Sequence, residues 1–348
     1  MRILALGTLL AALPLAAAAA PTIDLTGAGY VTYGDANSYS LPVNGLQVMS
    51  GPGQITLFTK LGLGANGQLD NGTAGMDDAF DTPQANTING FRMTSSNEPG
   101  SLEGAWDRNG WWDSTLSALD SAIDFSTYSM VFFFANNETG GSANDNLAAW
   151  AQVELTRISD DTSLGLFEFT NDADGDGVQG YGPPPAGGGV LGGDVTAFTS
   201  AGDAPVLADF VMSGGEVCLD ASNALVDCSG PGVVASFEHN LGGDRAAYAL
   251  VLPELDALIA GLLVGGADLS DYALHVQYRL GCGSDALFPT ITQGANTLCD
   301  PSYALNGGDE KVFIGTQLAV VNVPEPTSVL LLATGLIGLS ALRRPKHS

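Results

Sequence analysis

The chain has 348 residues, of which 38 are Asp or Glu and only 11 are Lys or Arg, so its formal net charge at pH 7 is -27. Such a surface repels phosphate backbones and anionic lipids, which excludes nucleic-acid binding as the function. Four of the basic residues lie in the terminal segments 1–19 and 323–348, so the body between them is almost devoid of positive charge. We interpret this acidity as a source of solubility outside the cell or, alternatively, as a capacity for calcium.

The first residues have the pattern of an export signal. Arg2 precedes an apolar run at 3–15, and small residues follow at 16–20. A short basic start, an apolar stretch and a small-residue cleavage region are typical of a secretory signal peptide. We therefore expect signal peptidase to remove residues 1–19 while the chain crosses the inner membrane.

The body at 20–322 is predicted to be mainly β. Its apolar segments are short, and Gly (46 residues), Asn, Asp, Ser and Thr separate them, which is typical of a sandwich or a jelly-roll-like fold. The apolar run Met130 to Phe134 lacks polar alternation and predicts a central strand that is buried on both faces. The predicted strands lie at 29–33, 54–61, 88–94, 128–135, 148–157, 164–170, 206–212, 233–239, 246–252, 273–280 and 311–321.

Two short helices are expected within this body. The first covers 114–125, with Asp113 or Ser114 as its N-cap. The second covers 253–264, with Pro253 at its first helical position and Gly265 after its end. The second helix is apolar but too short to span a bilayer, so we expect it in the core.

The segment 177–193 is too rich in Gly and Pro to form regular structure. It is either a linker between two lobes or a long surface loop of one body. We favour one body, because neither half looks self-contained.

The strongest metal-binding pattern is formed by Asp172, Asp174 and Asp176, with Gly177 in the sixth place. Alternating carboxylates and a glycine of this kind surround calcium in EF-hand loops. The twelfth position, however, is Pro183 instead of the expected Glu, and the alternative is a solvated acidic turn. Calcium is the one cofactor that the sequence suggests. A second acidic stretch at 70–81 is better interpreted as a turn between strands.

Three tryptophans, Trp106, Trp111 and Trp112, lie close together in the sequence. Flat aromatic rings stack on sugars, and polar neighbours at Asp107, Arg108, Asn109 and Asp113 would hydrogen-bond the hydroxyl groups. The sequence thus suggests a carbohydrate platform. The alternative is that these tryptophans belong to the core of a β-rich body.

Four cysteines, Cys218, Cys228, Cys282 and Cys299, are expected to form disulfides in an exported chain. Three pairings exist, and proximity favours Cys218 with Cys228 and Cys282 with Cys299. A zinc site is the alternative, but no pair has the close spacing of a zinc knuckle.

Catalytic motifs are missing from the sequence. The body has two histidines, His239 and His275, and contains neither Gly-x-Ser-x-Gly nor His-Glu-x-x-His. A pair of carboxylates for glycoside hydrolysis remains open, because any two of 38 acidic residues could converge. We expect a protein that is not an enzyme.

The C-terminal segment has three parts. Pro324, Glu325 and Pro326 come first, an uncharged apolar run follows at 327–342, and Arg343 and Arg344 begin a basic tail that ends at 348. As a helix the run is roughly 24 Å long, the minimum for a membrane span. Because the basic residues follow the helix, the positive-inside rule places the body outside the cytoplasm. The alternative is a buried C-terminal helix of a soluble domain.

This order of motif, apolar helix and basic end resembles the PEP-CTERM sorting signal of bacterial exosortase substrates. The resemblance is confined to the segment 323–348. It implies that a membrane protease, the exosortase, recognises the tail and processes it at or near Pro-Glu-Pro. It also implies release to, or retention at, the outer surface, usually in bacteria that make exopolysaccharide.

Together these features predict an exported surface or extracellular-matrix protein that is associated with exopolysaccharide. A carbohydrate-binding module is the alternative from the class of binding proteins. A surface glycoside hydrolase or lyase is the alternative from the class of enzymes.

Overall fold

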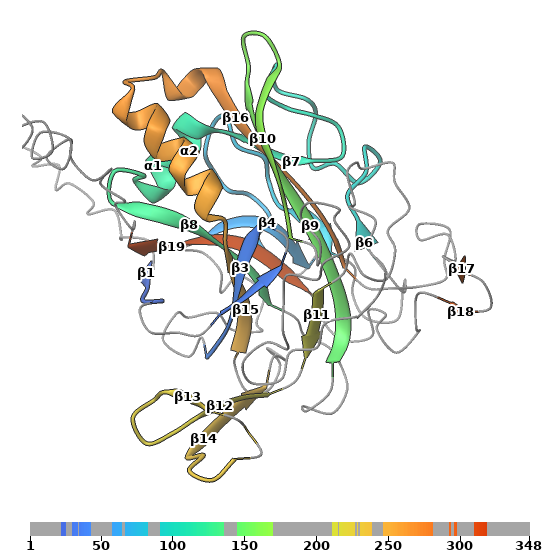
Figure 1. Cartoon of the computed structure of the whole chain (residues 1–348). Coiled ribbons are helices and arrows are strands. Elements are labelled where there is room, and N and C mark those ends of the chain that lie inside the picture. Colours follow the sequence, from blue (N-terminus) through green and yellow to red (C-terminus); the bar gives the residue numbers. More distant parts are fainter. Residues whose placement is uncertain are drawn as a thin grey trace, which may run out of the picture.

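The structure is a computed structural model that describes residues 22–25, 30–33, 35–42, 58–64, 67–82, 91–135, 145–169, 211–214, 216–226, 228, 230–238, 246–280, 292–293, 296–297 and 310–318. Within these residues the chain is mainly β, with several sheets and two α-helices, as the sequence predicts (Figure 1). The helices found in this part of the chain are too short to cross a membrane.

The larger sheet has eight strands in the order β2-β3-β15-β8-β19-β4-β5, and β1 pairs with β19. Most neighbours are antiparallel, but β1 and β19, and β4 and β5, run parallel. The strands are β1 (Thr22–Ile23), β2 (Val31–Tyr33), β3 (Ala36–Pro42), β4 (Thr59–Gly64), β5 (Phe80–Thr82), β8 (Tyr128–Ala135), β15 (Ala246–Val251) and β19 (Lys311–Leu318).

Strand β8 lies between β15 and β19 and is buried on both faces, which confirms the prediction from its apolar run. Phe132 and Phe134 belong to one apolar core, whereas Val131 and Phe133 belong to a second core on the opposite face. Burial of a Phe side chain contributes about 1.5–3 kcal/mol, so this strand is a main source of stability. Its aromatic run therefore fixes the centre of the sheet.

The smaller sheet has six strands, ordered β10-β9-β16-β6, with β11 beside β9 and β7 beside β16. The long β9–β16 ladder aligns residues from Tyr272 opposite Arg157 to Leu280 opposite Ala149. The strands are β6 (Phe91–Arg92), β7 (Trp112–Thr115), β9 (Asp145–Arg157), β10 (Thr162–Glu168), β11 (Val211–Gly214) and β16 (Tyr272–Leu280).

The two sheets share one apolar core. Successive residues of a strand point to opposite faces, so alternate residues from Ala151 to Leu155 of β9 and from Leu274 to Leu280 of β16 enter this core. The larger sheet contributes Met130, Phe132, Phe134, Leu250, Val312 and Ile314, and the smaller sheet contributes Ala151, Val153, Leu155, Leu274, Val276 and Tyr278. On the other face lie the polar side chains of Gln152, Glu154 and Thr156 of β9 and of His275 and Gln277 of β16.

The first helix, α1 (Leu116–Ile123), begins two residues later than predicted. Its N-cap is Thr115, whose hydroxyl accepts a hydrogen bond from the amide of Ala118. The predicted caps, Asp113 and Ser114, are wrong because both lie in β7 and pair with β16. Pairing with a distant strand therefore overrides a local helix-start signal.

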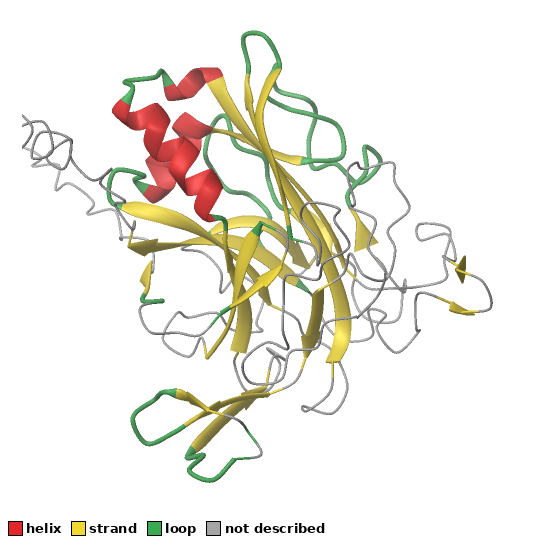
Figure 2. Ribbon diagram, viewed as in Figure 1, coloured by secondary structure: helices red, strands yellow, loops and turns green. Residues whose placement is uncertain are grey.

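The second helix, α2 (Pro253–Val264), has the predicted bounds. Only Leu255 and Ile259 of this helix are buried, and Val264 is 92% exposed. The interpretation of α2 as a core helix is therefore wrong, since it packs on the surface of the core with one narrow face. A short 3-10 helix, η2 (Leu269–Asp271), follows it and leads into β16. Figure 2 shows both α-helices at the same end of the molecule.

A three-stranded sheet forms a separate layer at the bottom of Figure 1, with β12 (Glu216–Leu219) between β13 (Leu225–Val226) and β14 (Ala235–Glu238). The Cys218–Cys228 disulfide closes a short loop of this sheet, which confirms that predicted pair. Cys282 and Cys299 lie outside the described residues. The last pair of strands is β17 (Thr292–Gln293) with β18 (Asn296–Thr297).

Candidate functional site

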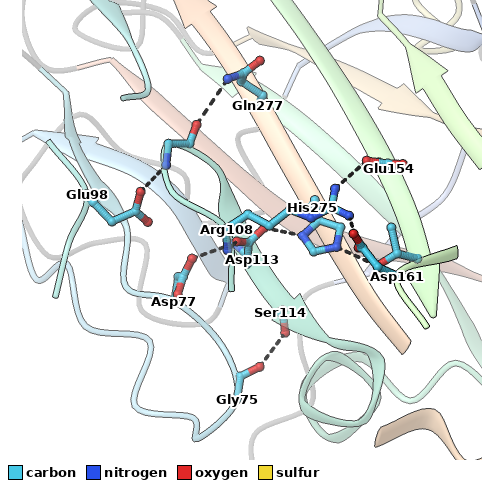
Figure 3. A network of polar contacts seen from close by, with 12 residues as sticks. Gly75, Asp77, Glu98, Arg108, Asp113, Ser114, Glu154, Asp161, His275 and Gln277 are labelled. Atoms are coloured by element: carbon cyan, nitrogen blue, oxygen red, sulfur yellow. Dashed lines mark hydrogen bonds and ion pairs between the residues drawn. The ribbon is translucent and has the colours of Figure 1, made fainter. Parts of the chain in front are cut away.

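A layer of polar side chains covers the face of β9 and β16 that points away from the shared core (Figure 3). Segment 93–111 lies over this face, and side chains of the face contact it at several points. The Gln277 side chain donates to the carbonyl of Gly110 (3.2 Å), the Arg108 guanidinium pairs with Glu154 (2.6 Å), and the Trp111 ring meets the His275 ring edge to face. Polar groups that would otherwise face water are thereby buried between a sheet and a loop.

Three residues of this layer form a continuous chain of hydrogen bonds. The Nδ1 atom of His275 lies 2.7 Å from Oδ1 of Asp113, and its Nε2 atom lies 2.8 Å from Oγ1 of Thr156. Strand register explains the arrangement, because His275 stands opposite Asp113 of β7 on one side and beside β9 on the other. The order Asp, His, hydroxyl has the form of a nucleophilic triad.

This chain of residues is almost completely buried. The exposed fractions of Asp113, His275 and Thr156 are 0%, 1% and 2%. Burial raises the pKa of Asp113 well above its usual value and lowers the pKa of His275 to about 3, because it penalises the charged form of each group. The second oxygen of Asp113 also accepts a hydrogen bond from the backbone amide of Arg108.

Arg108 forms an ion-pair fork at the exposed rim of the layer. Its two terminal nitrogens lie 2.6 Å from Glu154 of β9 and 2.7 Å from Asp161 of the β9–β10 turn. The guanidinium thereby fastens segment 93–111 to the end of the hairpin. Because Asp161 is largely exposed, its half of the fork contributes little to stability.

Three carboxylates converge on the opposite side of Asp113. One carboxylate oxygen from each of Asp77, Glu98 and Asp107 lies within 4.8 Å of the corresponding oxygens of the other two. Each side chain is fixed by a backbone amide that donates to one of its oxygens: Asp113 to Asp77 (2.7 Å), Gly110 to Glu98 (2.5 Å) and Glu103 to Asp107 (2.7 Å). We call Asp77, Glu98 and Asp107 the carboxylate cluster.

The carboxylate cluster is electrostatically unfavourable in the absence of a cation. Burial and neighbouring carboxylates raise the pKa of Asp77 to about 9, and burial raises the pKa of Glu98 to about 7 and that of Asp107 above its usual value. In addition, Oε1 of Glu98 and Oδ1 of Asp107 are buried without a hydrogen-bond partner among the described residues. Three hard oxygen donors in this state have the chemistry of a site for a divalent cation.

The position of Asp77 depends on a loop built around Lys60 and Asn71. The Asn71 amide group donates to the carbonyls of Lys60 (2.8 Å) and Asp77 (2.7 Å). The Lys60 ammonium, itself buried, donates to the carbonyls of Gln68 (2.9 Å) and Asp70 (2.5 Å). The acidic stretch at 70–81 is thus an ordered connection between β4 and β5, and it delivers Asp77 to the cluster.

The structure places the three tryptophans of the predicted carbohydrate platform in different environments. Trp112 is 0% exposed because it lies on the core side of β7, whereas Trp106 and Trp111 are partly exposed. Of the polar neighbours, Asp107 belongs to the carboxylate cluster, Arg108 to the ion-pair fork and Asp113 to the buried chain. Trp112 belongs to the apolar core, whereas the Trp111 ring contacts His275 on the polar face, so these two tryptophans do not share one exposed surface.

The remaining predicted site residues lie outside the described residues. They are the calcium-loop residues Asp172, Asp174 and Asp176, and the sorting residues Pro324, Glu325, Pro326, Arg343 and Arg344, together with the predicted helix at 327–342 and the signal peptide at 1–19.

Sequence reasoning did not single out Glu98 or the joint role of Asp77, Glu98 and Asp107. The one local signal for Glu98 is Gly110, which has a φ of +80° and whose backbone amide donates to the Glu98 carboxylate. A single glycine in a glycine-rich chain is too common to carry that inference.

The model of the PEP-CTERM protein-sorting motif matches residues 322–344, which confirms the resemblance of the tail. A mainly β body with this motif defines an exported, exosortase-sorted surface protein, with the exosortase as its processing partner. The family model described as Domain of unknown function (DUF8239) matches residues 20–279, and the chain belongs to this family. No curated protein and no solved structure matches the chain.

Proposed function

We propose that this chain is a non-enzymatic component of the cell surface or extracellular matrix, with a sandwich-like or jelly-roll-like body associated with exopolysaccharide. The observation that carries this proposal is the sorting motif at 322–344. In the proposed pathway signal peptidase removes 1–19, and a helix at 327–342 holds the body at the inner membrane. The exosortase then processes the tail at or near Pro324 to Pro326.

One geometric feature supports a role without catalysis. The hydroxyl of Thr156 is the nucleophile position of the Asp113–His275–Thr156 chain, but this residue is only 2% exposed. A nucleophile has to touch its substrate, and Thr156 is enclosed by the layer that surrounds it.

The intact mass of the protein from its native host, measured in membrane and medium fractions, tests the proposal. We expect a product that begins near residue 20 and ends near Pro-Glu-Pro, and that is recovered with extracellular polysaccharide. A surface product that still contains 327–348 would contradict the processing step. Hydrolysis of a polysaccharide that is lost in Glu98→Gln, with the fold intact, would contradict the non-enzymatic role.

Carbohydrate binding is the second candidate function, because Trp106 and Trp111 keep exposed area on the segment that carries Arg108. Aromatic faces beside charged groups suit sugar rings. The test is retention of the protein on purified exopolysaccharide, with Trp106→Ala and Trp111→Ala compared with Tyr30→Ala. Tyr30 is 53% exposed and serves as a matched aromatic control. Equal retention of all three variants would contradict carbohydrate binding through the two tryptophans.

A further inference from the structure

We propose that Asp77, Glu98 and Asp107 bind one calcium ion. This inference concerns the body alone and does not depend on the proposed surface function. It also differs from the calcium loop expected at Asp172, Asp174 and Asp176, which lies elsewhere in the sequence.

The spacing of the three oxygens suits a single calcium ion. Calcium binds oxygen at 2.3–2.6 Å, so two oxygens on the same ion are separated by at most about 5 Å. The donor oxygens of the carboxylate cluster lie within 4.8 Å of one another, which allows one ion to touch all three. Each residue can supply one ligand without a change in the backbone.

The three side chains are oriented before any ion arrives. Backbone amides of Asp113, Gly110 and Glu103 each hold one oxygen of Asp77, Glu98 and Asp107, respectively. These hydrogen bonds leave the second oxygen of each carboxylate available to a ligand. A preorganised set of ligands pays less conformational entropy on binding than a flexible acidic loop does.

The clearest sign of a missing partner is Asp107. Its side chain is only 9% exposed, and its Oδ1 atom has no hydrogen-bond donor among the described residues. Oε1 of the half-buried Glu98 is in the same state. A buried carboxylate oxygen without a partner costs several kcal/mol, and native structures rarely tolerate one without an ion or a water. A cation between these atoms would satisfy both of them.

Basic side chains do not neutralise this cluster within the described part of the chain. Arg108 pairs with Glu154 and Asp161, and Arg157 pairs with Asp160. The histidine nearest in the layer, His275, directs one nitrogen at Asp113 and the other at Thr156. Burial is the largest cause of the raised pKa of all three carboxyl groups.

The donor atoms select calcium over other common cations. All three are carboxylate oxygens, and hard oxygen ligands favour calcium or magnesium over zinc and copper. Magnesium requires near-ideal octahedral geometry and gives up its water reluctantly, whereas calcium accepts irregular ligand sets. Ligands that come from the connection at 67–79 and from segment 93–111 form an irregular set, and calcium suits it better.

The test is a calcium titration of the full chain after removal of metal with EGTA, by calorimetry and by thermal unfolding. Glu98→Gln and Asp107→Asn remove one ligand charge each while keeping the shape of the side chain. The matched control is the triple variant Asp172→Asn, Asp174→Asn, Asp176→Asn, which removes more charge at the other candidate loop. Magnesium chloride is titrated in parallel.

We expect the wild type and the triple variant to share a site whose Kd rises at least about tenfold in Glu98→Gln and in Asp107→Asn. Calcium should raise Tm in the wild type and the triple variant, and much less in the two single variants. Because Glu98 is only half buried, Glu98→Gln decides the result if Asp107→Asn does not fold. Three outcomes would overturn the proposal: no calcium bound at 10 mM, a loss confined to the triple variant, or magnesium binding as tight as calcium.

Discussion

The imidazole of His275 lies 2.7 Å from the carboxyl group of Asp113, although 162 residues separate them in the chain. Both residues are almost completely buried, and strand pairing of β7 with β16 brings them together. The contact fixes the covering segment 93–111 onto the smaller sheet, because Asp113 also accepts from the amide of Arg108 and donates its own amide to Asp77. The buried chain and the carboxylate cluster are therefore two sides of one polar layer.

Replacement of His275 by Ala should be strongly destabilising. It leaves the buried carboxyl of Asp113 and the hydroxyl of Thr156 without their ring partners, and unsatisfied buried groups of this kind cost about 2–5 kcal/mol together. Thr156→Val removes a single hydroxyl and should cost about 1 kcal/mol. Urea unfolding of both variants measures the difference. If Thr156→Val lowers the unfolding free energy as much as His275→Ala or more, the contacts of the His275 ring do not stabilise the layer.

Gly110→Ala should destabilise the covering segment more than Gly100→Ala. Both residues have positive φ, +80° and +87°, where a Cβ atom costs about 1 kcal/mol. A Cβ on Gly110 would also come within 3.2 Å of the backbone at Thr94, whereas one on Gly100 meets nothing within 4 Å. The difference between the unfolding free energies of the two variants measures the cost of the close contact that the Cβ atom makes at Gly110. Equal losses would mean that the backbone of 94–95 moves aside freely.

Because of Asp256, the free energy of unfolding should fall as the pH rises. Burial raises its pKa from 3.8 to about 7, so between pH 4 and pH 7 the folded chain keeps a proton that the unfolded chain has lost. The folded state binds more protons in this window, and its contribution to stability declines by up to about 4 kcal/mol by pH 7. Asp256→Asn should remove this decline and stabilise the protein at pH 7.5.

The control for that experiment is Glu254→Gln, which removes an exposed acid from the same first turn of α2. Urea midpoints of the wild type and both variants at pH 5 and pH 7.5 provide the comparison. If Asp256→Asn and Glu254→Gln shift the midpoints equally at both values, the burial of Asp256 has no part in the pH dependence.

Reduction of the Cys218–Cys228 bond should loosen the three-stranded sheet. The bond closes a loop with a sequence separation of 10, and the chain-entropy relation gives about 2.7 kcal/mol for such a loop. Amide hydrogen exchange in Cys218→Ser with Cys228→Ser should rise in β12, β13 and β14 and remain unchanged in β8. Uniform exchange across both regions would mean that this sheet unfolds together with the core.

Substitutions at two places in the sorting signal should impair maturation of the protein. Glu325→Ala should leave an unprocessed precursor in the membrane, since the change disrupts the Pro-Glu-Pro motif. Neutral replacements of Arg343 and Arg344 should impair retention at the membrane and correct processing, because the positive-inside rule predicts that basic residues after an apolar helix stay in the cytoplasm. Immunoblots of membrane and medium fractions measure both effects. Normal maturation of both variants would contradict the sorting mechanism.

Local patterns were sufficient for the elements whose neighbours in the chain determine them. The apolar run of β8 and the Pro253 start of α2 gave correct bounds, because burial and helix-start chemistry act within a few residues. Strand β3 (Ala36–Pro42) was missed, since its Asn and Ser residues resemble a turn while its pairing with β15 makes it a strand. Strand β7 was mistaken for the start of a helix for a related reason.

The polar layer was beyond prediction from the sequence because its partners are remote. His275 lies in no catalytic sequence motif, and nothing local connects it with Asp113. Among 38 acidic residues, the sequence offers no means of choosing Asp77, Glu98 and Asp107. Their convergence depends on hydrogen bonds from backbone amides, which no side-chain motif in the sequence reveals. The tryptophans were grouped by proximity, and the fold then separated Trp112 from Trp111.

The position of β19 has a consequence for the order of folding during export. This strand is the last one described, yet it lies between β8 and β4 and also pairs with β1 through Thr22 and Thr316, 294 residues apart. A chain that emerges from the membrane N-terminus first must therefore wait for residues 311–318 before its main sheet can close. The matched sorting motif begins only a few residues later, at 322. Completion of the fold and arrival of the tail at the membrane thus fall at the same moment of translocation.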